Sequence, residues 1–200
     1  MAKGFTDQEQ VVIRRKLKDA ARVCAVSSGM RKTTVEQLTR AADISKGAFY
    51  KFYVSKELLF FEILEDLHTE IYQASVDVLG RCDMLSPARR AAETILTACR
   101  IMNESGMTDF LEQDVPYLLR RIPAEVQAEH YHSDIVHITE LLQSAGLTPH
   151  GGAALAAATV RGLLLMVSHR KEIGESYPQV LDTLVRGACE RLFAAEAGYE

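Results

Sequence analysis

Apolar residues recur along most of this chain at the three- and four-residue spacing of an amphipathic helix. The segment from Asp7 to Ser28 shows it clearly, since Ile13, Leu17 and Ala21 would share one face. The same spacing predicts long helices over 55–79, 88–104, 123–145, 152–170 and 177–196. With only five prolines in 200 residues, the chain is predicted to be all-α.

The segment 33–57 is patterned differently, as short helices separated by tight breaks. Thr33 and Thr34 each precede a Glu or Gln by three residues, so overlapping capping boxes mark a helix start. After about two turns, the polar break at 43–45 ends this helix, and Ser45 can cap a second short helix over 46–52. Two short helices around a tight turn predict a helix-turn-helix.

This segment resembles the DNA-binding domain of the tetracycline-repressor (TetR) family of bacterial transcriptional regulators. The matching residues are Thr33, Thr34, Val35, Leu38, Ala41, Ala42, Ile44, Ser45, Lys46, Gly47, Phe49, Tyr50, Phe52, Ser55, Lys56, Glu57, Leu58 and Leu59. The chain departs from the family with Asp43 in place of a turn Gly, Thr39 in place of a small Ala, and Tyr53 in place of a Phe. Asp tolerates a left-handed turn conformation, at a higher cost than Gly.

The resemblance implies an N-terminal helix-turn-helix domain over 1–54, joined by a long helix to a helical ligand-binding and dimerisation domain over 55–200, with about nine helices in all. It also implies a homodimeric regulator, most simply a repressor released from its double-stranded operator DNA by a small apolar effector. The alternative is a helical module that binds a small molecule or a protein without recognising an operator.

Charge is divided unevenly along the sequence. Residues 1–60 contain twelve Lys and Arg against six Asp and Glu, whereas the chain as a whole carries a formal charge of −4. A basic N-terminal third on an acidic body fits phosphate binding, because each cation placed on DNA releases counterions. The predicted DNA-contacting residues are Thr33, Thr34, Ser45, Lys46, Gly47, Tyr50, Lys51 and Lys56, with Tyr50 and Lys56 at positions that resemble the family's phosphate contacts.

Pro116 interrupts the pattern between 105 and 123, where the mouth of a ligand cavity could form. The predicted cavity residues are Phe61, Leu64, Met102, Phe110, Glu112, Asp114, Tyr117, His132 and Met166. Most of the apolar ones fit plain core better than a ligand contact, since every helical bundle needs such a stripe. The carboxylates favour a cationic or hydrogen-bond-donating ligand over an anion.

The last two helices combine small residues with apolar stripes, which allows close packing of helices. The resemblance implies a two-fold dimer through Leu155, Leu163, Leu181, Leu184 and Ala188. Periodicity alone would equally permit a bundle within one chain.

No nucleotide-binding, hydrolase or metalloprotease motif occurs in the sequence, so we expect no enzyme activity and no cofactor. His130, Asp134 and His137 share a predicted helix face, but three ligands without a fourth favour a solvated surface over a metal site. The start of the sequence lacks an apolar leader, so we expect a cytoplasmic protein without a membrane partner.

Overall fold

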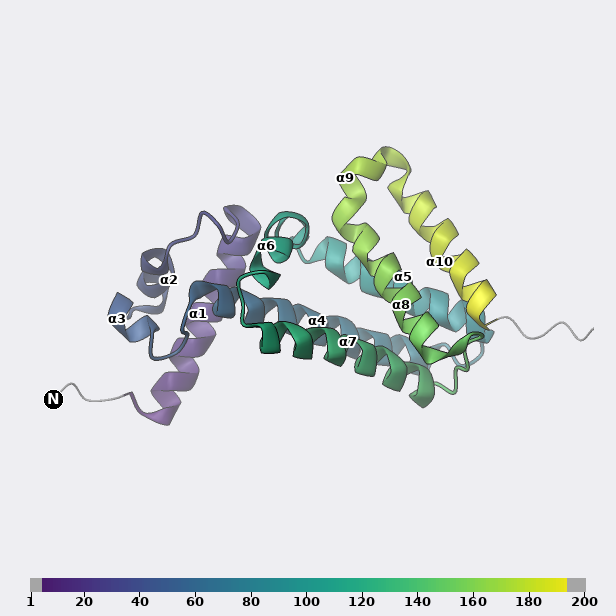
Figure 1. Cartoon of the computed structure of the whole chain (residues 1–200), viewed down its shortest axis with the longest axis horizontal. Coiled ribbons are helices and arrows are strands. Elements are labelled where there is room, and N and C mark those ends of the chain that lie inside the picture. Colours follow the sequence, from purple (N-terminus) through teal and green to yellow (C-terminus); the bar gives the residue numbers. More distant parts are fainter. Residues whose placement is uncertain (1–4, 194–200) are drawn as a thin grey trace, which may run out of the picture. The chain divides into compact units, whose positions relative to one another are not determined.

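The computed structural model describes residues 5–193, and every regular element among them is a helix (Figure 1). The helices are α1 (Asp7–Ser27), α2 (Val35–Ala42), α3 (Lys46–Phe49), α4 (Lys56–Arg81), α5 (Pro87–Glu104), the π-helix η1 (Phe110–Asp114), α6 (Val115–Leu119), α7 (Ala124–Ser144), α8 (Gly152–Leu165), the 3₁₀ helix η2 (Met166–His169), α9 (Arg170–Ile173), the 3₁₀ helix η3 (Gly174–Ser176) and α10 (Tyr177–Phe193). The all-α prediction is confirmed.

Within these residues the chain forms two compact units. The first comprises 5–68 and 106–123, and the second comprises 69–105 and 124–193. Helix α4 therefore contributes its N-terminal half to one unit and its C-terminal half to the other. Each unit combines two segments that are separated along the chain. The predicted division into domains at residue 54 stays a prediction.

The core of the first unit is built on α1. This helix starts with a capping box, in which the Thr6 hydroxyl accepts from the Glu9 N–H and the Glu9 carboxylate accepts from the Thr6 N–H. Leu17 from α1, Leu38 from α2 and Phe49 from α3 are completely buried. Helices α1, α2 and α3 therefore share one core.

The N-terminal half of α4 closes this core with Leu59, Phe60 and Ile63, which are buried. On the rim, the Lys18 ammonium from α1 lies 2.7 Å from an Asp66 carboxylate oxygen of α4. Burial lowers the pKa of Lys18, but its hydrogen bond to Asp66 and the nearby carboxylate charges outweigh this and raise it. Helix α4 extends to Arg81, two residues beyond its predicted end.

The segment 106–123 changes direction where the sequence predicts a break. Gly106 has a positive φ of 72° after α5, the π-helix η1 follows, and α6 starts at Val115. Pro116 lies in the first turn of α6, where its missing N–H costs no helical hydrogen bond. Phe110 from η1 is buried and its ring centroid lies 6.0 Å from that of Phe60.

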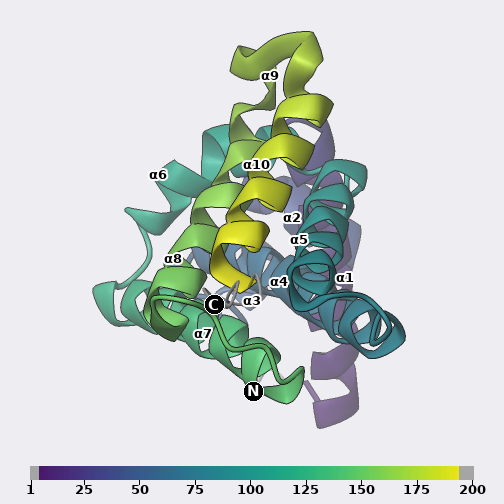
Figure 2. The ribbon, with the colours of Figure 1, turned by 90° about the vertical axis from the view of Figure 1, so that its right-hand side faces the viewer.

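In the second unit, α10 packs along α5, and α8 lies against α7 and α10 (Figures 1 and 2). Helix α5 starts one residue before its predicted start: the Ser86 hydroxyl accepts from the Arg89 N–H, and Pro87 is the first helical residue. The core residues include Leu79, Ala92, Ile95, Cys99, Leu142, Leu147, Ala156, Leu163, Val167, Leu181, Val185 and Leu192.

Helices α8 and α10 form an antiparallel pair joined by η2, α9 and η3 (Figure 1). Gly174, with φ 77°, lies in this connection. The run Gly152–Phe193 is long and apolar enough to cross a membrane by composition, yet α8 has 14 residues and α10 has 17. Each is shorter than the roughly 20 residues that a span needs. The predicted end of the last helix, 194–196, lies outside the described residues.

Candidate functional site

Local hydrogen bonds fix both helices of the predicted helix-turn-helix. The Thr34 hydroxyl accepts from the Gln37 N–H at 3.2 Å, and the Gln37 side chain accepts from the Thr34 N–H at 2.7 Å, which completes one of the two possible capping boxes. The Ser45 hydroxyl accepts from the Ala48 N–H at 3.1 Å and starts α3. Each helix therefore starts at a residue that the sequence marks.

Asp43 turns the chain between α2 and α3 in the left-handed conformation, with φ 57° and ψ 45°. The neighbouring Ile44 N–H donates back to the Thr39 carbonyl at 3.0 Å, which closes the end of α2. The predicted left-handed Asp at this turn is confirmed.

The outer side of α3 is polar and cationic. Its exposed residues are Ser45, Lys46, Gly47, Tyr50 and Lys51. Phe49 points the other way and is completely buried. Ammonium, hydroxyl and backbone N–H groups are the donors that proteins place against DNA phosphates, and a glycine lets a backbone approach closely.

Lys46 forms an ion pair with Glu36 of α2, with 2.6 Å between Nζ and Oε1. The hydrogen bond from Lys46 lowers the pKa of Glu36, and the same bond raises the pKa of Lys46. Both side chains are exposed, so the pair adds little stability and the ammonium can exchange Glu36 for a phosphate.

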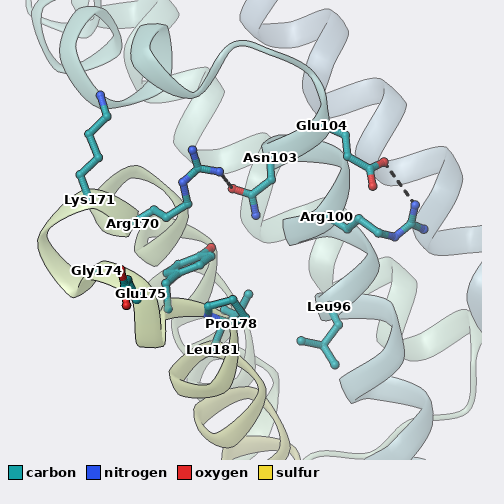
Figure 3. Close-up of a pocket in the computed structure, with 11 residues that line it drawn as sticks. Leu96, Arg100, Asn103, Glu104, Arg170, Lys171, Gly174, Glu175, Pro178 and Leu181 are labelled. Carbon is teal, nitrogen blue, oxygen red and sulfur yellow. Dashed lines mark hydrogen bonds and ion pairs between the residues drawn. The ribbon is translucent and has the colours of Figure 1, made fainter.

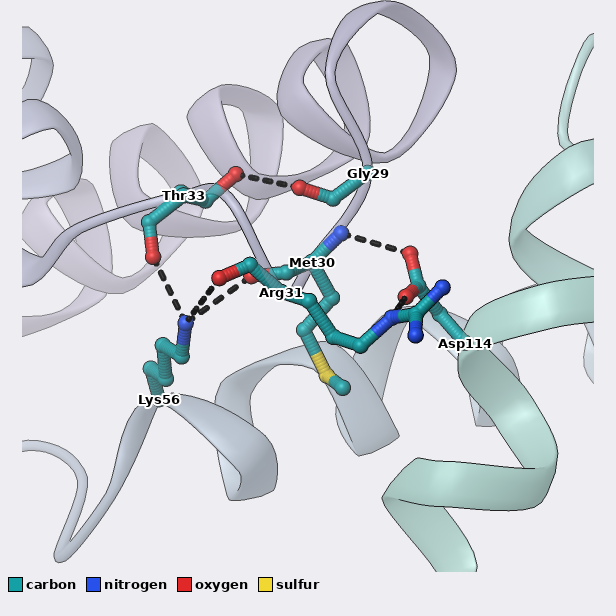
Figure 4. Close-up of polar contacts among 6 residues, drawn as sticks. All are labelled: Gly29, Met30, Arg31, Thr33, Lys56 and Asp114. Carbon is teal, nitrogen blue, oxygen red and sulfur yellow. Dashed lines mark hydrogen bonds and ion pairs between the residues drawn. The ribbon is translucent and has the colours of Figure 1, made fainter.

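Two of the predicted DNA-contacting residues instead hold the turn between α1 and α2, which we call turn 29–33 (Figure 4). Thr33 is 1% exposed and its hydroxyl donates to the Gly29 carbonyl at 2.8 Å. The Lys56 ammonium donates to the carbonyls of Met30 (2.9 Å), Arg31 (3.4 Å) and Thr33 (2.7 Å). We therefore assign Thr33 and Lys56 to positioning α2 and not to contacting DNA.

Asp114, the last residue of η1, binds the same turn (Figure 4). Its carboxylate, 4% exposed, accepts from the Met30 N–H at 2.7 Å and from the Arg31 Nε at 3.0 Å. Gly29 has φ 79°, and a Cβ there would lie 2.8 Å from an Asp114 oxygen. The turn thus needs both the freedom and the small size of glycine.

This use of Asp114 corrects its predicted place among ligand residues, because both oxygens already have donors in the protein. In the same unit Leu64 and Phe110 are core residues, Phe61 and Glu112 are half-buried, and the Arg121 guanidinium lies 4.6 Å from the Tyr117 ring centroid. The preference for a cationic ligand rested on the carboxylates of Glu112 and Asp114. Because Asp114 is already engaged, that preference has less support.

The remaining ligand candidates lie in the second unit. Met102 and Met166 are partly buried and pack on its core, whereas His132 is exposed on α7. These three do not line one cavity as predicted, because the two methionines pack on the core while His132 faces solvent.

The predicted dimer residues divide by exposure. Leu155 on α8 and Leu184 on α10 are 52% and 47% exposed, and Ala188 is half-buried. Leu163 and Leu181 belong to the core of their own unit, at 8% and 7% exposed. Only the first two present enough apolar surface to a second chain.

A groove between α5 and the connection into α10 is the feature that the sequence did not indicate (Figure 3). Its volume is about 660 Å³. The lining residues are Leu96, Arg100, Asn103 and Glu104 from α5, and Arg170, Lys171, Gly174, Glu175, Tyr177, Pro178 and Leu181 from the α9–α10 region. The polar stretch 171–176 marked a connection in the sequence, but nothing there specified which α5 residues face it.

Of the three residues of the metal alternative, Asp134 has a side chain outside those that the structure describes. His130 is buried, and the His137 ring lies 4.9 Å from that of Tyr72. His137 is exposed, as expected for a solvated surface residue, whereas His130 is not.

Two of the four cysteines, Cys99 and Cys189, are buried in the second unit, where they pack as small hydrophobes. Burial raises the pKa of Cys99 to about 12 and that of Cys189 to about 11. Neither thiolate forms at neutral pH, so neither thiol is a good nucleophile.

Comparison with known families decides what the helix-turn-helix belongs to. Residues 17–63 match the model of the bacterial regulatory proteins of the tetR family. Residues 17–63 are therefore a DNA-binding domain of the TetR family. The match includes α2, the Asp43 turn and α3, so this helix-turn-helix is of the kind found in TetR-family proteins, which are transcription regulators and not enzymes.

Solved structures extend the likeness to the whole TetR-family fold. A TetR transcriptional regulator from Rhodococcus sp. is 15% identical, with TM-score 0.61, 94% of this chain and 100% of that chain covered. Thermus thermophilus FadR in complex with lauroyl-CoA is 18% identical (TM-score 0.66; 94% and 98% covered). RolR in complex with resorcinol is 20% identical (TM-score 0.61; 92% and 90% covered). At these identities the likeness shows the fold alone, and among curated proteins none matches the chain.

Proposed function

We propose that this TetR-family protein is a cytoplasmic repressor that binds a double-stranded operator as a homodimer and leaves it when a small apolar effector binds. Residues 1–54 act as the DNA-binding domain and 55–200 as the ligand-binding and dimerisation domain. The observation that carries the proposal is the exposed cationic side of α3, with Lys46, Tyr50 and Lys51 around Gly47 on a helix-turn-helix.

Binding in the major groove would bring this side of α3 to the base edges and flanking phosphates. Lys46 and Lys51 supply charge, and the Tyr50 hydroxyl supplies a neutral hydrogen bond to phosphate. Thr34 and Ser45 stand at the N-termini of α2 and α3, where free backbone N–H groups favour phosphate. The excess of cations over acids in residues 1–60 adds long-range attraction.

An effector is supported by the relatives of known structure. Bacillus subtilis FadR binds stearoyl-CoA, and RolR binds resorcinol, so proteins of this fold accept very different small molecules. The fold therefore supports a ligand-responsive repressor and leaves the ligand's chemistry to the residues of this chain.

Helix α4 offers a route from effector to operator, because its two halves belong to different compact units. A ligand that favours one setting of α4 would change the separation of the two α3 helices in the dimer. It would then weaken operator binding by its differential affinity for the two states. A two-fold dimer implies a palindromic operator.

The decisive experiment is a gel shift with the DNA that flanks the protein's own gene, repeated over a range of salt. We expect Lys51→Ala to weaken binding to every sequence and to reduce the slope of log K against log salt by about one. Tyr50→Phe should weaken binding without changing that slope. Lys56→Ala, which loses the bonds that hold turn 29–33, should lower the thermal midpoint instead.

The matched control is Arg191→Ala, an exposed cation of α10 far along the sequence from α3, which should leave the salt slope unchanged. A Lys51→Ala slope equal to that of wild type would remove α3 from the DNA interface. Failure of the wild-type protein to select any sequence would favour the alternative, a helical module that binds a small molecule or a protein.

A further inference from the structure

The groove beside α5 and α10 combines an apolar floor with charged walls (Figure 3). Leu96, Pro178 and Leu181 supply apolar surface. Its volume, about 660 Å³, falls within the roughly 300–1,000 Å³ of small-molecule sites. All lining residues belong to the second unit, and none takes part in the proposed DNA contact.

Tyr177 places an unsatisfied polar group in this groove. The residue is 5% exposed, and its buried hydroxyl has no hydrogen-bond partner among the described residues. Burial raises the pKa of Tyr177, and the nearby Asn103 side chain opposes part of this rise. The geometry between the two side chains is not that of a hydrogen bond. A buried hydroxyl without a partner is costly, so a ligand atom that accepts its proton is favoured.

Arg170 supplies the matching charge. Among the residues that the structure describes, its guanidinium has one hydrogen bond, to the neutral Asn103 side-chain oxygen at 3.5 Å, the outer limit of such a bond (Figure 3). A carboxylate would replace this contact with shorter, charge-assisted bonds in the forked geometry that guanidinium favours. By contrast, Arg100 is already paired with Glu104 at 3.4 Å.

The remaining charges limit the ligand to a single negative group. Three cations and two carboxylates line the groove, so the balance is slightly positive. Glu175 would repel a second carboxylate on the ligand. The apolar floor favours an uncharged body beyond the carboxylate.

We propose that this groove binds a small apolar monocarboxylate, with its carboxylate accepting from Arg170, Asn103 and the Tyr177 hydroxyl and its body over Leu96 and Leu181. Binding itself does not depend on DNA. Only the groove's service as the effector site rests on the function proposed above.

The test uses the full chain and three probes of one shape: 2-naphthoate, neutral 2-naphthamide and cationic 2-naphthylmethylammonium. Calorimetry and thermal shift should show that naphthoate binds about tenfold or more tightly than the others, because charged hydrogen bonds distinguish it. Arg170→Ala should remove about the same factor. Tyr177→Phe should weaken binding several-fold while the thermal midpoint of the unliganded protein stays the same or rises, because the variant loses an unsatisfied buried hydroxyl. Arg191→Ala, outside the groove, should bind as wild type.

The proposed site would be overturned if Arg170→Ala and wild type bound naphthoate equally. It would also be overturned if naphthamide bound as tightly as naphthoate, or if naphthoate did not bind at millimolar concentration. Inorganic phosphate binding as tightly as naphthoate would overturn the apolar half of the proposal. If naphthoate binds and the operator complex persists, the groove is not the effector site. If the unliganded protein binds no operator, the repressor proposal fails and the naphthoate result stands.

Discussion

Asp43 shows how one residue bears the geometry of the helix-turn-helix. It is the one described non-glycine residue with positive φ, where an L side chain is disfavoured. Asp tolerates this better than Ala because its short polar side chain can bond locally, and Gly tolerates it best. We expect the thermal midpoint to be highest for Asp43→Gly, intermediate for wild type and lowest for Asp43→Ala. The unfolding free energies of the two variants should differ by about 1 kcal/mol.

Chemical denaturation of the three proteins would check this order. Operator affinity should follow stability only weakly, since Asp43 is not among the residues assigned to DNA. An alanine variant as stable as the glycine variant would show that the left-handed turn costs nothing here.

At the scale of elements, the π-helix η1 matters because it ends in Asp114, which binds turn 29–33. Asp114→Asn keeps the side-chain shape, but the amide is neutral and has a single acceptor oxygen. It therefore cannot accept from both Met30 and Arg31. We expect the unfolding free energy to fall by about 1–3 kcal/mol, the cost of leaving a buried donor unsatisfied. Hydrogen exchange should show faster exchange of the Met30 amide and of the start of α2.

The control is Asp83→Asn, an exposed carboxylate of the connection before α5, which removes the same charge. Equal exchange protection of turn 29–33 in Asp114→Asn and wild type would mean that η1 does not hold the turn. If operator binding weakens in Asp114→Asn and not in Asp83→Asn, η1 is a positioning element for α2.

At the scale of the whole molecule, the proposed dimer depends on apolar surface that one chain leaves exposed on α8 and α10. Leu184→Glu should yield monomers that remain folded and bind operator poorly, because the charge would be buried against the partner. Sedimentation velocity with a gel shift measures both effects.

Leu163→Glu is a poor test of assembly but a useful contrast. Leu163 lies in the core of its own unit, so a charge there should unfold the unit whatever the oligomeric state. A Leu184→Glu protein that stays dimeric would place the interface on another surface.

The sequence by itself determined the features whose causes are local. Helix starts at Thr34, Ser45 and Ser86, the break before Pro116 and the left-handed Asp43 depend on hydrogen bonds and dihedral angles within a few residues, so their signals are readable in order along the chain. The core positions of α1 and α2 followed from helical period alone. The density of such signals over 33–59 is also why the family was recognisable.

Only the tertiary structure decided which polar side chains are already engaged. Lys56 lies 23 residues from Thr33 and Asp114 lies 84 from Met30, so no periodicity could show that an apparent phosphate contact and an apparent ligand carboxylate both serve turn 29–33. The groove has the same origin, because Arg170 and Asn103 are 67 residues apart. Spacing reports which residues share a face of one helix, whereas the availability of a donor or acceptor depends on what the rest of the chain brings to it.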